Sequence, residues 1–205
     1  MRVTVIDYKA GNLTSVLKTL RHVGADTVVT DGDLSLVGQA ERIVLPGVGH
    51  FAATSRLDQT GLTGAIRAAI ARGVPFLGIC VGMQWLYAGS TEAPEQPGLG
   101  HFPQQCARFA ESALKVPHVG WNSLEAREGS RLLAGVEPGE HVYFTHSFKA
   151  PVTADTAATT FYIQPFAAAV EQDSVMGVQF HPEKSGETGL KILRNFLSWN
   201  KSVAA

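Results

Sequence analysis

The stretch PFLGICVGMQ, residues 75–84, decides the fold that this sequence predicts. It begins as a short apolar run, which is typical of a strand buried on both faces, and residues 83–86 continue it as a helix. Cys80 lies at the turn between the two, with Gly78 and Gly82 on either side. Glycines there allow unusual backbone angles and let the helix approach its own strand closely. The pattern Gly-x-Cys-x-Gly therefore has the form of a nucleophile elbow that carries sulfur.

A sulfur at such a turn lies at the N-terminus of a helix. Free N–H groups and the helix dipole favour a thiolate over a thiol there, which makes Cys80 a candidate nucleophile. The alternative is that Cys80 is a small buried apolar residue, the usual situation of a free cysteine. For the second cysteine, Cys106, the sequence supports no role beyond core packing.

The residues before the elbow alternate between strand and helix patterns. Strands are expected at 3–7, 27–30 and 43–45, and helices at 13–22, 34–39 and 62–72. Asn12 precedes the first of these helices and is a natural N-cap. Strands that alternate with helices predict an α/β fold, with an open, doubly wound, mostly parallel sheet that is flanked by helices.

The second half of the chain has a different composition. Residues 88–103 are rich in glycine, proline and acidic residues and are expected to form a loop. Further strands are expected at 106–110, 142–148, 159–163, 166–170 and 175–180. They resemble antiparallel additions to one edge of the sheet, and an amphipathic helix at 189–199 is expected to pack back on it. Since no repeat or linker interrupts the chain, residues 1–205 are expected to form a single domain.

The overall composition argues against several classes of function. The chain of 205 residues carries a formal net charge of −1, so nothing indicates nucleic acid or an anionic membrane as a partner. The sequence has no apolar run of about 18 residues and no apolar signal segment, so no membrane span is expected. Two cysteines do not make a disulfide framework, and the cytoplasm is the expected compartment.

A thiolate nucleophile needs a base, and the base needs an orienting group. His181-Pro182-Glu183 directly follows the apolar run 175–180. Residues i and i+2 of an extended chain point to the same side, so His181 and Glu183 are expected to project together. In an open α/β sheet, ligand sites gather outside the carboxyl ends of the strands, where Cys80 also lies. The sequence therefore predicts a triad of Cys80, His181 and Glu183, although His-Pro-Glu alone would be no more than a polar turn.

Zinc bound by the same three side chains is a weaker alternative, because the elbow explains them without a metal. His141 and His146 are five residues apart on an expected strand and so point to opposite faces. No metal is expected.

Acyl chemistry on a thiolate also needs donors for an oxyanion. The backbone N–H of Val81, directly after the candidate nucleophile, is one donor. The loop Pro46-Gly47-Val48-Gly49 is a second source, because its two glycines let the peptide planes present their N–H groups or flip to do so. The alternative is a Gly/Pro turn without a role. The sequence contains neither Gly-x-Gly-x-x-Gly nor a P-loop lysine, which argues against a phosphate loop.

Three strings together resemble the class I, triad-type glutamine amidotransferases: PGVG at 46–49, LGICVGMQ at 77–84 and GVQFHPEKS at 177–185. Within that class, three more are similar to the glutaminase subunits of imidazole glycerol phosphate synthases: IDYKAGN at 6–12, KVPHVGWN at 115–122 and YFTHSF at 143–148. The resemblance runs from residue 2 to about residue 199.

The resemblance implies a reaction and a set of residues for it. Cys80 would be the nucleophile, His181 the general base and Glu183 its orienting residue, and L-glutamine would be hydrolysed to glutamate and ammonia through a thioester. The resemblance makes Gly47, Val48 and Gly49 an oxyanion strand that needs a peptide flip for activity. The implied contacts to glutamine come from Gln84, Ser147 and Phe148, the last two mainly through their backbone.

The resemblance also implies a partner, a (βα)8-barrel cyclase that would take up the ammonia in histidine biosynthesis and form a heterodimer with this chain. Trp121, Asn122, Tyr143 and Lys184 would face that partner. Trp121 could instead be a core aromatic residue, and Lys184 a solvated charge. No cofactor is implied.

The sequence departs from the family pattern at three places. Lys9 stands where the family usually has glycine, Phe148 replaces a common tyrosine, and Gln164-Pro165-Phe166 takes the place of a glycine-containing turn. These departures concern loop geometry and partner contacts rather than the triad.

Three other functions stay open. The chain could be the glutaminase of another synthase, such as those for anthranilate or pyridoxal phosphate, but the string at 117–122 argues against this. It could be a catalytically silent regulatory relative, although all three triad residues are present. It could be a redox sensor or chaperone on a similar sheet, but those proteins lack His-Pro-Glu after a late strand.

Overall fold

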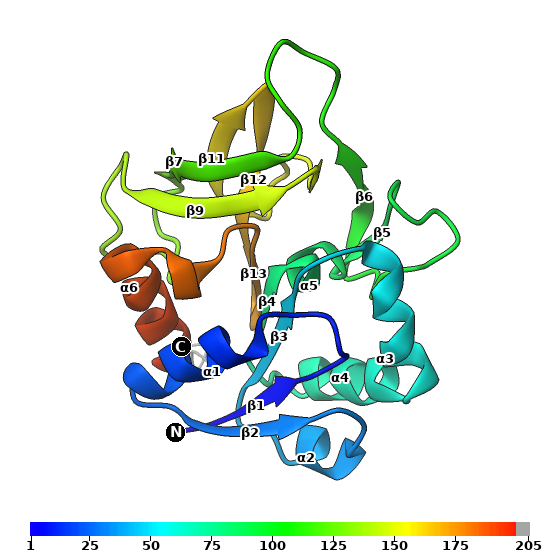
Figure 1. Cartoon of the computed structure of the whole chain (residues 1–205). Coiled ribbons are helices and arrows are strands. Elements are labelled where there is room, and N and C mark those ends of the chain that lie inside the picture. Colours follow the sequence, from blue (N-terminus) through cyan, green and yellow to red (C-terminus); the bar gives the residue numbers. More distant parts are fainter. Residues whose placement is uncertain (200–205) are drawn as a thin grey trace.

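A mostly parallel sheet forms the centre of the computed structural model, which describes residues 1–199 (Figure 1). Its strands are β1 (Arg2–Ile6), β2 (Asp26–Thr30), β3 (Ile43–Gly47), β4 (Phe76–Cys80), β8 (Glu125–Ala126), β11 (Thr156–Tyr162), β12 (Gln164–Gln172) and β13 (Val175–Val178). Their order across the sheet is β2-β1-β3-β4-β13-β12-β11-β8. The strands from β2 to β13 in this order are parallel, and β12, β11 and β8 add antiparallel pairs at one edge. The expected sheet architecture is confirmed, while residues 200–205 of the expected single domain lie outside the described residues.

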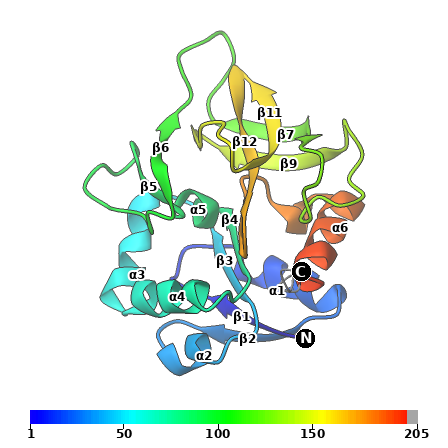
Figure 2. The same cartoon turned by 180° about the vertical axis from the view of Figure 1, so that it is seen from behind.

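Helices cover both faces of this sheet. They are α1 (Leu13–His22), α2 (Leu34–Gly38), α3 (Ser55–Gln59), α4 (Leu62–Ala71), α5 (Val81–Gln84) and α6 (Gly186–Leu197), with 3-10 turns η1 (Phe51–Thr54) and η2 (Pro182–Lys184). Figures 1 and 2 show α1 and α6 on one face and α4 on the other. Asn12 occupies the N-cap position of α1, but its side chain makes no capping hydrogen bond. The last helix begins at Gly186 and not at residue 189, because its first turn is polar and shows no apolar period.

Two small sheets lie beside the main one, and the sequence did not predict them as such. One contains β5 (Tyr87–Ser90), β6 (Phe102–Arg108) and β10 (Phe148–Lys149). The expected loop at 88–103 is therefore wrong at its two ends, which belong to the strands β5 and β6. The other pairs β7 (His118–Ser123) with β9 (His141–His146). The expected strands at 106–110 and 142–148 therefore belong to these small sheets and not to the edge of the main sheet.

The sequence did not predict the strand β7, because its apolar residues face solvent and its polar residues face the protein, the reverse of a core-facing strand. Its apolar residues point outward, and Val119 and Trp121 are 57% and 56% exposed. The alternate residues His118, Gly120 and Asn122 face the protein, and His118 is buried. An alternation with polar residues inside carries no signal of a core-facing strand.

Two of the departures from the family pattern lie at or next to residues with left-handed backbone. Lys9 has a φ of 64°, in the left-handed region that favours glycine, and its amine pairs with Asp7 and Asp31 at 2.9 and 3.0 Å. Ile163, directly before the departure at 164–166, has a φ of 63° in the tight turn between β11 and β12. A β-branched residue in this region is strained.

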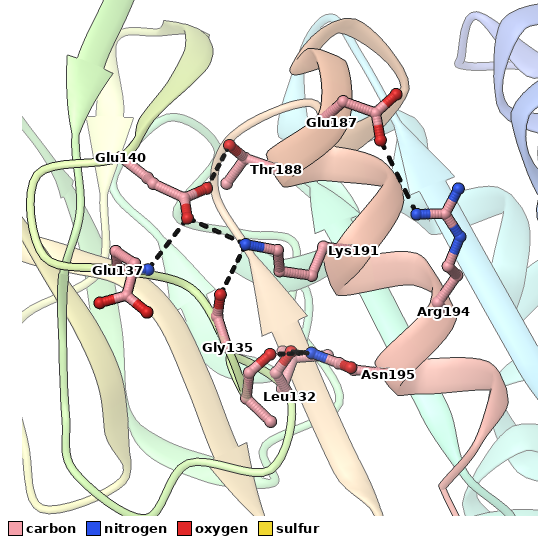
Figure 3. Close-up of polar contacts among 10 residues, drawn as sticks. Leu132, Gly135, Glu137, Glu140, Glu187, Thr188, Lys191, Arg194 and Asn195 are labelled. Atoms are coloured by element: carbon pink, nitrogen blue, oxygen red, sulfur yellow. Dashed lines mark hydrogen bonds and ion pairs between the residues drawn. The ribbon is translucent and has the colours of Figure 1, made fainter.

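Polar contacts fasten α6 to the segment that precedes β9 (Figure 3). The Glu140 carboxylate accepts hydrogen bonds from the backbone N–H of Glu137 at 3.0 Å and from the Thr188 hydroxyl at 2.5 Å. The Lys191 amine donates to the same carboxylate at 3.0 Å and to the Gly135 carbonyl at 2.5 Å. These donors, led by the Glu137 N–H, lower the pKa of Glu140 from 4.5 to about 2.

Glu140→Gln is expected to destabilise the chain by about 1–2 kcal/mol at pH 7. The neutral amide accepts the hydrogen bonds of Thr188, Lys191 and the Glu137 N–H less strongly than the charged carboxylate does. The folded pKa lies below the ordinary value, so this stabilisation is present above pH 4.5 and is lost as the pH falls toward 2. The difference from the unmodified chain in urea unfolding should therefore shrink by about half or more at pH 3.

Glu187→Gln provides the matched control on the same helix. The Glu187 carboxylate is 85% exposed and lies 3.8 Å from Arg194 (Figure 3). Its removal should change the free energy of unfolding by less than about 0.5 kcal/mol at every pH. Equal costs for the two variants would contradict the role given to Glu140.

Candidate active site

The turn from β4 to α5 has the geometry of a nucleophile elbow. Cys80 ends β4 with φ 54° and ψ −108°, a combination that non-glycine residues rarely adopt and that neighbouring structure must hold. A Cβ on Gly82 would lie 1.9 Å from the Leu45 carbonyl oxygen, and one on Gly78 would lie 2.4 Å from the Gly82 oxygen. Both positions therefore require glycine for the close approach of α5 to the sheet.

The sheet brings His181 next to this elbow. β13 pairs with β4 in parallel, with Val178 opposite Ile79, so both strands deliver the following residues to the same edge. His181 is fixed there by its backbone N–H, which donates to the Tyr143 carbonyl at 2.9 Å, and by its carbonyl, which accepts from the Ser185 hydroxyl at 2.7 Å. Cys80, His181 and Glu183 therefore come together at the edge where the sequence predicted them.

His181 and Glu183 form a buried pair. The Nδ1 atom of His181 lies 2.9 Å from Glu183 Oε1, and both side chains are 2% exposed. Burial alone would lower the pKa of His181, but the adjacent Cys80 and Glu183 more than offset this and raise it well above its usual value. The second ring nitrogen, Nε2, has no hydrogen-bond partner among residues 1–199 and is free to exchange a proton.

A cavity of about 260 Å³ opens above the sulfur. It is lined by Val48, Gly49, Cys80, Val81, Gln84, Glu92, Pro117, Thr145, His146, Ser147 and Phe148. The structure thus gathers most of the residues expected to bind substrate or an oxyanion. A larger hollow of about 360 Å³ lies beside Gly73 and Ser174, at the amino ends of β4 and β13, and its lining includes neither cysteine nor histidine.

The candidate oxyanion strand runs along the edge of the cavity. Gly47 is the last residue of β3 and pairs with Cys80, and Gly49 has a φ of 89°. A Cβ on Gly47 would lie 3.0 Å from the Gly82 nitrogen and would collide with the Tyr8 hydroxyl. That hydroxyl is buried and has no hydrogen-bond partner in the described part of the chain.

Gln179 is a site residue that sequence reasoning missed. It is completely buried, and its Nε2 atom lies 3.5 Å from the Cys80 sulfur. Its carbonyl oxygen accepts a hydrogen bond from Gln84 Nε2 at 3.0 Å. Two features of the sequence could have indicated it: Gln179 is the one polar residue in the run 175–180, and it lies two residues before His181.

The four residues expected at a partner surface lie together near β7 and β9. Trp121 pairs with Tyr143 across these strands, with ring centroids 6.1 Å apart, and the Lys184 amine lies 5.5 Å from the Tyr143 ring centroid. Trp121 is exposed and so is not a core residue. Asn122 donates to the Phe161 carbonyl at 3.0 Å, and the Phe161 side chain is 66% exposed. We call Val119, Trp121 and Phe161, with Tyr143 and Lys184 beside them, the β7 surface.

Other expectations concern cysteine, metals and membranes. Cys106 is fully buried, and burial raises its pKa, in keeping with core packing. Residues 1–199 contain no group of three or more histidine, cysteine or acidic residues arranged to hold a metal ion. Within the same residues, no helix is both long and apolar enough to cross a bilayer.

The family model "Glutamine amidotransferase class-I" matches residues 4–199. The chain belongs to this family. A solved structure of another glutamine amidotransferase has the fold described above: the two match with a TM-score of 0.75 at 21% identity, over 95% of this chain and 96% of the other.

Two relatives of this amidotransferase are named imidazole glycerol phosphate synthase subunit HisH. That of Rhodospirillum rubrum is 44% identical, over 97% of this chain and 99% of its own. That of Synechocystis is 46% identical, over 95% of both chains.

Proposed function

We propose that the chain is the glutaminase subunit of an imidazole glycerol phosphate synthase and hydrolyses L-glutamine to glutamate and ammonia. The observation that carries this proposal is the convergence of the Cys80 elbow and the buried His181–Glu183 pair on one cavity. The choice of synthase rests on the similarity to the HisH subunits over almost the whole chain.

The proposed reaction uses Cys80 as nucleophile and His181 as acid and base. The thiolate attacks the side-chain amide carbon of glutamine, and His181, protonated and held by Glu183, gives its proton to the departing ammonia. A γ-glutamyl thioester remains on Cys80. Water then attacks the thioester while His181 takes its proton, and glutamate leaves with regeneration of the thiolate.

The negative oxygen of each tetrahedral intermediate needs N–H donors. Val81 follows the nucleophile in the chain and lines the cavity, so its N–H is the first candidate. Gly47, Val48 and Gly49 supply the second, after a flip of a peptide plane that the left-handed backbone of Gly49 accommodates. Gln84, Ser147 and Phe148 line the rest of the cavity and are proposed to hold the glutamine.

The β7 surface is proposed to face the (βα)8-barrel cyclase that receives the ammonia. Val119, Trp121 and Phe161 are 57%, 56% and 66% exposed. Large apolar residues that are exposed close together mark interaction sites. The Tyr143 carbonyl accepts the backbone N–H of His181, and Lys184 directly follows Glu183, so this surface lies beside the triad. A cytoplasmic heterodimer is the assembly that we propose.

The test is glutamate release from L-glutamine, measured with the chain alone and with a cyclase partner plus its nucleotide substrate. We expect stimulation by one or more orders of magnitude, its loss in Cys80→Ala, and weaker stimulation in Trp121→Ala. Leu114→Ala, which also truncates an exposed apolar residue, is the control for Trp121. A rate of glutamate release that is the same with and without the cyclase would point to another synthase. No glutamate release under any condition would favour a regulatory relative.

A further inference from the structure

We propose that Gln179 is a further catalytic residue of this glutaminase: its side-chain N–H donates to the Cys80 sulfur and holds it as a thiolate. The proposal deepens the proposed function, because it concerns the same nucleophile. It rests on a buried chain of hydrogen bonds whose orientation is fixed at one backbone carbonyl, that of Phe148.

The Phe148 carbonyl determines which way the two glutamine amides point. Gln84 Nε2 lies 3.0 Å from the Phe148 oxygen and 3.0 Å from Gln179 Oε1. A carbonyl only accepts hydrogen bonds, so the Gln84 atom beside it must be the NH2 group. The Gln179 atom that meets this NH2 group must then be its oxygen. The NH2 group of Gln179 is left facing the Cys80 sulfur, at 3.5 Å.

This orientation favours one form of the sulfur. An amide NH2 group donates and does not accept, so the sulfur must be the acceptor in this contact. A donor in a buried site stabilises an anion much more than a neutral thiol. Gln179 therefore supports the thiolate with a donor of its own, in addition to His181.

A second arm of the chain holds the Phe148 carbonyl in place. His146 Nδ1 donates to this carbonyl at 2.9 Å, so its Nε2 atom is left to accept from His118 Nδ1 at 3.3 Å. His118 Nε2 in turn accepts from Asn122 Nδ2 at 3.4 Å. In this series of hydrogen bonds each imidazole donates through Nδ1 and accepts through Nε2, which requires that both rings are neutral.

The surroundings keep the two imidazoles neutral. His118 stacks on Tyr162 with ring centroids 4.0 Å apart, and Phe109, Phe144 and Phe166 pack around the histidine pair. Burial in this aromatic cluster lowers the pKa of His118 to about 4 and that of His146 to about 3. His146 is therefore a positioning residue, which acts on the sulfur through Phe148, Gln84 and Gln179.

Alkylation of Cys80 by iodoacetamide tests the proposal without any need for glutamine hydrolysis. Gln179→Met keeps the length of the side chain and removes the donor, and Gln179→Glu places a carboxylate against the sulfur. We expect the rate of Cys80 alkylation at pH 7.5, followed on the Cys80 peptide, to fall about 10-fold in the first and about 100-fold in the second. For glutamine hydrolysis, kcat should fall by similar factors while KM changes by less than about twofold.

Gln172→Met is the matched control, because the Gln172 side chain donates to Asp155 at 3.1 Å, away from the cavity. It should alkylate at the rate of the unmodified chain. Rates in folded Gln179→Met and Gln179→Glu that equal the control would overturn the proposal. Slowed alkylation supports it even if no variant hydrolyses glutamine, an outcome that would count against the proposed function alone.

Variants of His146 test the second arm and leave Gln179 unchanged. His146→Asn keeps an N–H donor near the Phe148 carbonyl, whereas His146→Leu removes it. We expect Cys80 alkylation several-fold slower in the leucine variant and within about twofold of the unmodified rate in the asparagine variant. Equal rates in the two folded variants would show that the Phe148 carbonyl does not orient Gln84 and Gln179.

Discussion

Replacing Glu183 by glutamine is expected to lower kcat for glutamine hydrolysis by about 10³–10⁴-fold with little change in KM. Glu183 Oε1 lies 2.9 Å from His181 Nδ1, so it selects the tautomer with the proton on Nδ1. A glutamine amide can present its NH2 group to Nδ1 instead. The proton then moves to Nε2, the nitrogen that must take a proton from the sulfur and from water, and His181 can no longer act as the base.

Steady-state kinetics in the presence of the cyclase would measure this effect. Thermal unfolding of the same samples would show whether the variant is folded, since Glu183 is almost completely buried. Glu187→Gln, four residues along the chain and exposed, should keep its full kcat. A Glu183→Gln variant with more than about a tenth of the normal kcat would be incompatible with Glu183 as the orienting residue.

Gly82→Ala is expected to destabilise the chain by about 3–5 kcal/mol and to abolish the reactivity of Cys80. The new Cβ would lie 1.9 Å from the Leu45 carbonyl oxygen and 3.0 Å from its carbon. Both obstacles are backbone atoms of β3, a strand that is paired on both sides, so no side chain can move away to make room. Relief requires α5 to shift, which moves the residues that directly follow Cys80.

The thermal midpoint and the alkylation rate of Cys80 would be measured together for this variant. Gly64→Ala is the control: Gly64 lies within α4, and apart from its own helix no atom of residues 1–199 lies within 4 Å of the added Cβ. Alanine there should be neutral or stabilise the helix by up to about 1 kcal/mol. A Gly82→Ala chain that unfolds within about 2 °C of the unmodified one would refute the close contact between α5 and β3.

The sequence predicted those parts of the site that a few neighbouring residues are enough to identify. Cys80 lies between two glycines after an apolar strand, and His181 and Glu183 are two residues apart at the end of another. Because the carboxyl ends of parallel strands meet at one edge, these two patterns were enough to bring all three residues together.

The parts that the sequence did not predict depend on partners far along the chain. The contact of Gln179 with Cys80 joins residues 99 positions apart and requires the register of β4 against β13. The strand β7 was missed because His118 and Asn122 face inward and Trp121 outward, which reverses the usual alternation. The structure explains this alternation: the inward-facing His118 pairs with His146, and the outward-facing Trp121 belongs to the exposed β7 surface.

The departure at Phe148 also becomes understandable from the structure. Phe148 contributes its backbone carbonyl to Gln84 and His146, so these contacts do not depend on whether its side chain is phenylalanine or tyrosine. At Lys9, another of the departures, the side chain makes ion pairs with Asp7 and Asp31.

The placement of nucleophile and base on neighbouring parallel strands has a consequence for how such an enzyme can diverge. Their separation is set by the backbone ladder of β4 and β13, which side-chain substitutions hardly alter. β7 and β9 form a separate sheet, and β11 lies two strands away from β13 in the main sheet, so none of the three contributes to that ladder. Residues that recognise a partner protein can therefore be exchanged during evolution while Cys80 and His181 keep their positions. A glutaminase of this kind could in this way come to supply ammonia to a different synthase.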